Sequence, residues 1–395
     1  MISSTKAILI LTSQILIGFA VGVVVACSPT KFSTANDVIT TGDGVHTDVQ
    51  NCAAQGSYTG CTSTFKIGSG KVDILFVDDN SASMSFEQKN MAAKFGGFVE
   101  ALDRKQIDYR IAITTTDLNT VSQKKLITLG NGKSFLTNAD SNRVGLFNSS
   151  VVRQETVACE SYIKGIINTY GSGWRSASEY QANYSKMCPS SDERGTYTSF
   201  LVLNENTDSF MRADANLNII AISDEDVRSA SGNLEANDKY DTFISMMGTK
   251  YPSKYWEFNS IIVKDNSCMD AQSKQIVDQQ GQSAVSSSIG YEYAKLSNSA
   301  ALSIDGSPRP RGQILDICQS DYTQHFSTIA TQISESSRLR TLLCKPESSP
   351  TVTNKNNASL AVPFTWDGDT KIVFGAGTEG TEVVLSYRCY TGGIK

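Results

Sequence analysis

The chain has 395 residues, 40% hydrophobic and 19% charged, a balance typical of folded proteins that argues against general disorder. The formal net charge is −5 and no Lys/Arg-rich run stands out, so nucleic acid is not expected as a partner. The chain has two histidines, His46 and His325, so we do not expect a histidine-based zinc site or histidine-based catalysis. This length accommodates one large domain and a smaller one.

The N-terminal segment predicts export. Lys6 precedes an uncharged, largely apolar run from Ala7 to Ala26. Its length is close to that of a membrane span, so a transmembrane anchor is the alternative interpretation. Gln14 and its small neighbours weaken the apolar centre, and the run ends in Val24-Val25-Ala26-Cys27, which resembles the lipobox of bacterial lipoproteins.

The lipobox resemblance implies a signal peptide over residues 1–26 and a diacylglycerol group on Cys27. Several acyl chains on one cysteine anchor a protein stably in a membrane. In the sorting rule known for such proteins, an aspartate after the cysteine signals retention in the inner membrane. Ser28 occupies that position, so we expect a lipid anchor in the outer membrane, facing the periplasm or the exterior.

The other eight cysteines form an even set, which in an exported chain predicts disulfides rather than free buried thiols. None has the C-x-x-C spacing of a metal site. Connectivity does not follow from sequence, and the working hypothesis pairs neighbours: Cys52–Cys61, Cys159–Cys188, Cys268–Cys318 and Cys344–Cys389.

Residues 27–70 are rich in Ser, Thr, Gly and Asp, which predicts a flexible tether with Cys52–Cys61 as a clip. The pattern changes at Lys71, where residues 72–77 have the continuous apolar run of a strand buried on both faces. Apolar residues at helical spacing follow, at Met91, Phe95, Phe98 and Leu102. The same patterns predict a strand at 109–115, a helix at 157–170, a polar and irregular surface excursion at 171–205 held by Cys188, a strand at 217–222, a helix containing Phe243, Met246 and Met247, a strand at 258–263, a helix at 291–296, a strand at 302–304 and a helix at 326–339.

This alternation predicts an α/β domain over residues 71–342, with a doubly wound, mostly parallel sheet and helices on both faces. Short apolar runs at 360–366, 371–374 and 382–387 predict a small antiparallel β-unit over residues 343–395. A unit of that size is marginal alone, so docking or a Cys344–Cys389 bridge would stabilise it.

One loop carries recognisable chemistry. Asp79, Ser81 and Ser83 form a D-x-S-x-S pattern directly after the first predicted strand. Ligands of open α/β sheets bind outside the carboxyl ends of the strands, and short oxygen-bearing side chains on one loop there can face a common point. Carboxylate and hydroxyl oxygens suit Mg²⁺, Mn²⁺ or Ca²⁺. The alternative is an Asx-turn that starts the next helix.

The string from Val72 to Met84 resembles the first strand and metal loop of von Willebrand factor A domains, and the resemblance covers roughly residues 70–340. In that family the loop belongs to a metal-ion-dependent adhesion site. A later aspartate completes it, and Asp224 matches after the strand at 217–222. Glu225 and Asp226 follow in what we expect to be a solvated acidic turn; the alternative is that they add charge to the site or shift its metal preference.

The family also supplies a threonine from a second loop. Thr156, before the helix at 157–170, fits best, with Thr115 and Thr116 as rivals at a strand end. The usual Gly-Thr pair is absent, because Glu155 precedes Thr156. The implied ligand set is Asp79, Ser81, Ser83, Thr156 and Asp224, with Mg²⁺ as the expected ion and Mn²⁺ or Ca²⁺ as alternatives.

Three functions remain open. The first is a surface-anchored adhesion module whose metal is completed by a carboxylate from a protein or acidic polysaccharide. The second is a structural envelope lipoprotein that uses the fold for protein interaction without a functional metal. The third is a hydrolase, which we do not expect, because no G-x-S-x-G is present and nothing in the sequence places His325 beside Ser81 or Ser83.

Overall fold

The computed structural model describes residues 50–67, 70–118, 125–213, 215–252, 254–302, 308–342, 344–375, 377–378 and 380–390. The predicted signal peptide, Cys27 and residues 27–49 of the predicted tether lie outside these ranges. Among the helices in the described ranges, none is both long and apolar enough to cross a membrane.

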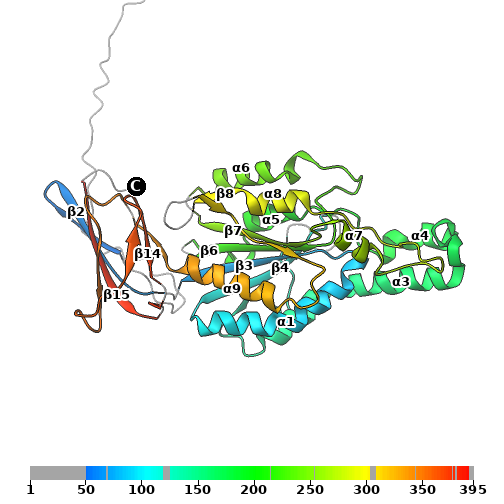
Figure 1. The fold of residues 1–395 in the computed structure, drawn as a ribbon, viewed down its shortest axis with the longest axis horizontal. Coiled ribbons are helices and arrows are strands. Elements are labelled where there is room, and N and C mark those ends of the chain that lie inside the picture. The colour runs from blue at the N-terminus through cyan, green and yellow to red at the C-terminus, as the bar shows by residue number, and fades with distance from the viewer. Residues whose placement is uncertain are drawn as a thin grey trace, which may run out of the picture. The chain divides into compact units, whose positions relative to one another are not determined.

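A six-stranded sheet in the order β10-β7-β6-β3-β4-β5 forms the centre of the fold (Figure 1). Five strands run parallel, and the short edge strand β5 pairs antiparallel with β4. The chain is therefore a mixed α/β protein with a mostly parallel central sheet. The strands are β3 (Lys71–Asp78), β4 (Asp108–Thr115), β5 (Leu136–Thr137), β6 (Asn216–Ser223), β7 (Trp256–Ile262) and β10 (Ile314–Asp316).

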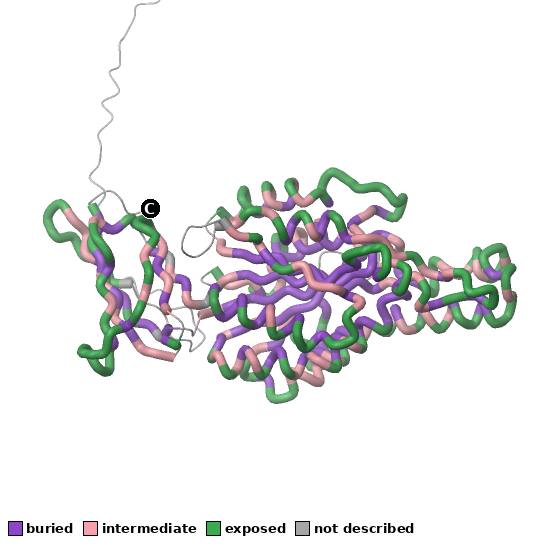
Figure 2. Tube along the Cα trace, in the orientation of Figure 1, coloured by how far each residue is buried: buried purple, intermediate pink, exposed green. Residues whose placement is uncertain are grey.

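Helices cover the sheet on both faces, and the inner strands β3, β6 and β7 are buried along nearly their whole length (Figures 1 and 2). On one face Phe76 of β3 packs edge-on against Phe95, Phe147 and Phe326. On the other face Phe258 of β7 packs against the rings of α6 and α8. The first layer contains α1 (Ser85–Arg104), α2 (Arg143–Val151) and α9 (Thr323–Ser337), and the second contains α5 (Gly195–Glu205), α6 (Tyr240–Lys250) and α8 (Tyr291–Asn298).

Strand register brings three strand ends to one edge of this sheet. Asp78, the last residue of β3, pairs with Thr115 at the end of β4 and with Ile222 near the end of β6. The segments that leave these strands therefore start side by side. Ligands of open parallel sheets bind at this carboxyl-terminal edge.

The excursion between β5 and β6 is helical, so the prediction of an irregular stretch at 171–205 is wrong. Helix α3 (Gln154–Tyr170) leads into the 3-10 helix η2 (Gly171–Ser176), α4 (Ser178–Met187) and α5. The Cys159–Cys188 disulfide joins α3 to the residue after α4. Small residues and tyrosines weaken the apolar periodicity of α4, none of whose residues is buried.

The prediction of a tether up to residue 70 is wrong for residues 50–66. They form β1 (Gln50–Gln55) and β2 (Tyr58–Lys66), which join a four-stranded antiparallel sheet in the order β1-β2-β15-β12. Strand β2 pairs along its whole length with β15, and alternate side chains at Cys61, Ser63 and Phe65 are buried. The small β-unit is thus built from both ends of the described chain. Its other strands are β11 (Leu339–Thr341), β12 (Thr351–Asn354), β13 (Phe364–Trp366), β14 (Lys371–Phe374) and β15 (Glu382–Tyr390).

Four disulfides are present, Cys52–Cys61, Cys159–Cys188, Cys268–Cys318 and Cys344–Cys389, which are the four neighbouring pairs. Such a set fits an oxidising compartment outside the cytoplasm. The sequence patterns missed several short elements, among them α2, β5 and β10. Also unpredicted are α7 (Asn266–Ser273) and β9 (Pro308–Pro310), whereas β8 (Ala300–Leu302) lies two residues before its expected position.

Candidate metal centre

The loop after β3 folds its polar side chains toward one another. The backbone N–H of Asp79 donates to the carbonyl oxygen of Ile222 at 3.0 Å, which ties the loop to β6. One carboxylate oxygen of Asp79 accepts from the backbone N–H of Ser81 at 2.8 Å, as in an Asx-turn. The other accepts from the Ser223 hydroxyl at 2.6 Å. The hydroxyl oxygens of Ser81 and Ser83 lie 3.0 Å apart, so two hard oxygen donors converge.

Thr156 lies against this loop from the first turn of α3. Its hydroxyl donates to the carbonyl oxygen of Asn80 at 2.8 Å and accepts from Gln88 Nε2 at 3.3 Å. Gln88 Nε2 also lies 2.9 Å from the carbonyl oxygen of Asp79, so one amide joins the loop, α1 and α3. The rival Thr116 is engaged differently, because its hydroxyl donates to Glu193 Oε2 at 2.5 Å.

Asp224 follows β6 and is fully buried, yet neither of its carboxylate oxygens makes a hydrogen bond of normal geometry to the described residues. Burial raises its pKa well above the ordinary range, and the charges of Asp79, Glu225 and Glu87 add to that rise, whereas the Ser83 hydroxyl is near enough to lower the pKa. Asp78 Oδ1 and Glu87 Oε2 are also buried without a partner in the described part of the chain. Buried carboxylate oxygens without partners are costly unless a cation or protons accompany them.

The acidic turn after β6 is not solvated, contrary to expectation. Glu225 is 4% exposed and contacts the Arg228 guanidinium and the Ser286 hydroxyl. Asp226 is partly buried, and its carboxylate accepts from the backbone N–H of Glu292 at 3.0 Å, in the first turn of α8. Glu225 therefore belongs to the same buried acidic group as Asp79, whereas Asp226 supports a helix end.

Glu193 is the acidic residue that sequence reasoning missed. It lies between α4 and α5 and is 1% exposed. Burial raises the pKa of Glu193 well above the ordinary value, and the charges of Asp79 and Glu225 raise it further. Sequence pattern gives no sign of this placement, because residues 171–205 read as a polar surface stretch and the Thr116 contact spans 77 positions.

A cavity of about 210 Å³ opens beside the loop. Its lining includes the loop residues Ser81 and Ser83, and acidic and basic side chains face the same space. The other charged and aromatic residues of the lining are Glu193, Glu225, Arg175, Arg228, Tyr180 and Tyr184. Both cysteines of the Cys159–Cys188 disulfide also line the cavity, so the segment that contains α3 and α4 forms one of its walls.

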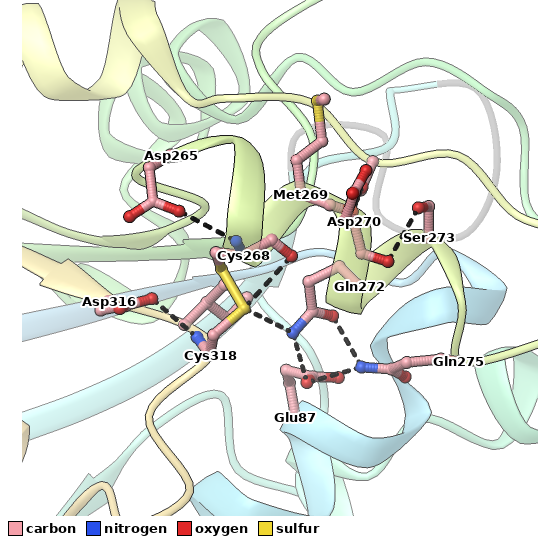
Figure 3. Close-up of a disulfide and its surroundings, with 12 residues drawn as sticks. Glu87, Asp265, Cys268, Met269, Asp270, Gln272, Ser273, Gln275, Asp316 and Cys318 are labelled. Carbon is pink, nitrogen blue, oxygen red and sulfur yellow. Dashed lines mark hydrogen bonds between the residues drawn. A yellow bond between two sulfur atoms is a disulfide. The ribbon is translucent and has the colours of Figure 1, made fainter.

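A second group contains residue types that can bind a metal, but its two cysteines form a disulfide. Cys268, Asp316 and Cys318 lie close together, but the two sulfur atoms are bonded to each other (Figure 3). The Asp316 carboxylate accepts from the backbone N–H of Cys318 at 2.9 Å. Figure 3 also shows Gln272 donating to Glu87 Oε1, at 2.9 Å. This group links α7 to the first turn of α1 and has no free thiolate to offer a metal.

His325 does not join the loop serines. Its Nε2 lies 2.7 Å from the carbonyl oxygen of Asp316, and its ring packs against Tyr322. Among the described residues no hydrogen bond connects this imidazole to Ser81 or Ser83. A Ser-His arrangement for nucleophilic catalysis therefore has no geometric support in the described part of the chain.

No protein-family model and no curated protein matches the chain. Among solved structures, it is similar to the open conformation of the pilus adhesin SpaC from Lactobacillus rhamnosus GG, with 10% identity and a TM-score of 0.35, covering 86% of this chain and 42% of that chain. It is also similar to the human COPII-coat protein Sec24c, with 9% identity and a TM-score of 0.29, covering 84% and 40%. A third similarity is to the N-terminal domains of the type V pili tip protein Mfa5 from Porphyromonas gingivalis, with 11% identity and a TM-score of 0.23, covering 85% and 64%. The chain spans less than two thirds of each of these structures.

Proposed function

We propose that this chain is a lipid-anchored binding module of the bacterial outer membrane that holds a divalent cation, with the doubly wound fold of von Willebrand factor A domains. Asp79, Ser81, Ser83, Thr156 and Asp224 would hold the ion. The proposal is of a binding protein and not of an enzyme. Mg²⁺ is the expected cation, with Mn²⁺ and Ca²⁺ as alternatives, and Cys27 would carry the lipid.

The observation that carries this proposal is the Asp224 carboxylate. Both of its oxygens are buried and make no hydrogen bond of normal geometry to the described residues, at the strand end beside Asp79. A fully buried carboxylate that faces other acids is unfavourable in the absence of a cation or protons. A divalent cation would satisfy these oxygens, directly or through bound water.

The donor set fits such an ion. Three hydroxyls, of Ser81, Ser83 and Thr156, gather at the loop, and two carboxylates, Asp79 and Asp224, accompany them. Oxygen donors of this kind bind hard divalent cations, and Mg²⁺ in particular keeps water or ligand oxygens in its shell. When bound, the ion would supply a positive centre for an outside carboxylate.

The cavity beside the loop suits a carboxylate presented by a protein or an acidic polysaccharide. Arg175 and Arg228 line it together with Ser81 and Ser83, so positive side chains lie in the wall that such a ligand would meet. Arg228 already pairs with Glu225, and Arg175 donates to the carbonyl oxygen of Ser283 at 2.8 Å. These contacts hold both guanidinium groups in place.

The test is metal-linked stability of the full chain, purified in a mild detergent and freed of metal. A ligand that binds only the folded state at 100 times its Kd stabilises it by about 2.7 kcal/mol. Mg²⁺ or Mn²⁺ should therefore raise the melting temperature of the wild type and of Asp270→Ala, an exposed aspartate on α7. The rise should vanish in Asp79→Ala. No rise in the wild type would favour the structural envelope protein without a functional metal.

A further inference from the structure

Glu193 is held rigidly at the cavity by the segment that carries it. Cys188, five residues earlier, is bonded to Cys159 of α3, and the Ser190 hydroxyl donates to Asp117 Oδ1 at 2.6 Å. The carbonyl oxygen of Glu193 accepts from the backbone N–H of Arg228 at 2.8 Å. The next residue, Arg194, pairs with Asp238 at 3.0 Å. This segment therefore presents the Glu193 side chain at a fixed position.

The Glu193 carboxylate is buried close enough to Asp79 for the two charges to interact. The Thr116 hydroxyl donates to one of its oxygens, and Asp79 and Glu225 are the acids whose charges act on it most strongly. Two carboxylates in contact repel each other unless a proton or a cation lies between them. Glu193 also lines the cavity together with Ser81 and Ser83, so it faces the same space as the loop hydroxyls.

The local charge is strongly negative. Asp79, Glu193, Asp224 and Glu225 are all buried, and among the described residues Arg228 forms an ion pair with this group, through Glu225. If all four carboxyl groups were ionised, one guanidinium would leave three negative charges uncompensated, so protons or a cation must accompany the group. Arg153, the other cation that acts at this loop, acts on Asp78. A divalent cation would remove most of the excess.

A second and independent observation points to the same ligand. Asp224 reaches the group from β6, and both of its buried oxygens lack hydrogen bonds of normal geometry to the described residues. Glu193 reaches it from a different segment, between α4 and α5. Two carboxylates from separate elements thus approach the loop hydroxyls, which is how protein sites for divalent cations are built.

We infer that Glu193 is an additional ligand of the divalent cation, bound to it directly or through a water molecule. The inference rests on the proposed metal site and extends its five-residue set. A further carboxylate tightens cation binding and weakens the attraction of the ion for an outside carboxylate. Thr116 then has a role of its own, because its hydroxyl orients Glu193 rather than contacting the metal.

The experiment is a calorimetric titration of the metal-free full chain, in detergent, with Mn²⁺ alone. Glu193→Gln keeps the size of the side chain and an acceptor oxygen for Thr116 but removes the charge. We expect the Kd for Mn²⁺ to rise 10- to 100-fold, the range found when groups that support a metal are replaced. The matched control is Glu205→Gln, at an exposed position at the end of α5, which should stay within twofold of the wild type.

The melting temperature of the metal-free protein separates a ligand from a structural residue. Glu193→Gln removes a buried charge that other acids repel. Without metal, the melting temperature of this variant should therefore equal or exceed that of the wild type. An unchanged Kd in a wild type that binds Mn²⁺ would overturn the inference and leave the proposed function standing. A lower melting temperature together with weaker binding would also overturn it. A wild type that does not bind Mn²⁺ removes the proposed function itself.

A second pair of variants covers the case in which Glu193→Gln does not fold. Thr116→Val removes the hydroxyl that orients Glu193 and should weaken Mn²⁺ binding severalfold, whereas Thr116→Ser keeps the donor and should bind like the wild type. Equal affinity in the two Thr116 variants would contradict the inference.

Discussion

The Thr156 hydroxyl donates a hydrogen bond to the carbonyl oxygen of Asn80 at 2.8 Å, across 76 positions of the chain. This contact joins the first turn of α3 to the loop after β3. It brings a third hydroxyl to the loop that carries Ser81 and Ser83.

Replacing Thr156 by Val should weaken both stability and metal binding. The buried carbonyl oxygen of Asn80 loses its donor, which costs about 1–3 kcal/mol. The cation loses one oxygen ligand, so we expect its affinity to fall about tenfold or more. Thr156→Ser keeps the hydroxyl and should retain most of both properties. Urea unfolding and Mn²⁺ titration measure the two effects, and a Val variant that binds Mn²⁺ as the wild type does would exclude Thr156 from the site.

Asp73 predicts a pH dependence of stability away from the metal loop. It lies on β3, accepts from Arg212 Nε at 2.8 Å, and burial raises its pKa to about 6 despite the Arg212 charge. A carboxyl whose pKa is raised on folding stabilises the protein fully below its unfolded pKa of about 4. That contribution, about 3 kcal/mol, is lost as the pH rises from about 4 to about 6.

The comparison variant is Asp73→Asn, which does not titrate. The free energy of unfolding of the wild type, minus that of Asp73→Asn, should decrease between pH 4 and pH 6 and stay level above pH 7. Urea unfolding at half-unit pH steps measures it. A difference that is constant or that increases with pH would contradict the raised pKa.

Because β2 pairs with β15, we expect residues 50–66 to be needed for the stability of the β-unit. Deleting them removes the partner of β15 along its whole length and exposes the edge of that strand. We expect a lower melting temperature and rapid proteolysis within residues 351–390. Deleting 28–44, an equal length of the expected tether, should change neither property. If both deletions behave alike, β1 and β2 contribute nothing to the unit.

The Cys268–Cys318 disulfide should contribute strongly to stability, because it joins residues 50 positions apart. Chain-entropy arguments give about 4 kcal/mol for a loop of that length. Replacing both cysteines by Ala should lower the free energy of unfolding by about that amount. The Cys52–Cys61 bridge, which spans 9 positions, should contribute less, about 2.6 kcal/mol. Unfolding in urea tests this order, which the reverse ranking would contradict.

The sequence predicted the elements whose pattern is local. The apolar run at β3 and the helical spacing of Met91, Phe95 and Phe98 on α1 place these two elements, and hence the loop between them. Asp224 could be placed because it also follows a buried strand, and parallel strands end at one edge of a sheet.

Contacts between distant segments were not predictable in this way. Glu193 lies in a polar stretch, and it reaches the site through contacts with distant segments, among them the Cys159–Cys188 disulfide and the Thr116 hydrogen bond. The tether was assigned from composition, which hid the period-two burial of Cys61, Ser63 and Phe65. That alternation is a signal of a half-buried strand and could have identified β2.

The most direct test of the metal site is the anomalous scattering of Mn²⁺ in crystals of the protein soaked with that ion. We expect one strong peak beside the hydroxyls of Ser81, Ser83 and Thr156 and near the Asp224 carboxylate, with Glu193 in direct or water-mediated contact. Crystals soaked at a Mn²⁺ concentration that raises the melting temperature, but with no peak at this loop, would contradict the proposed site.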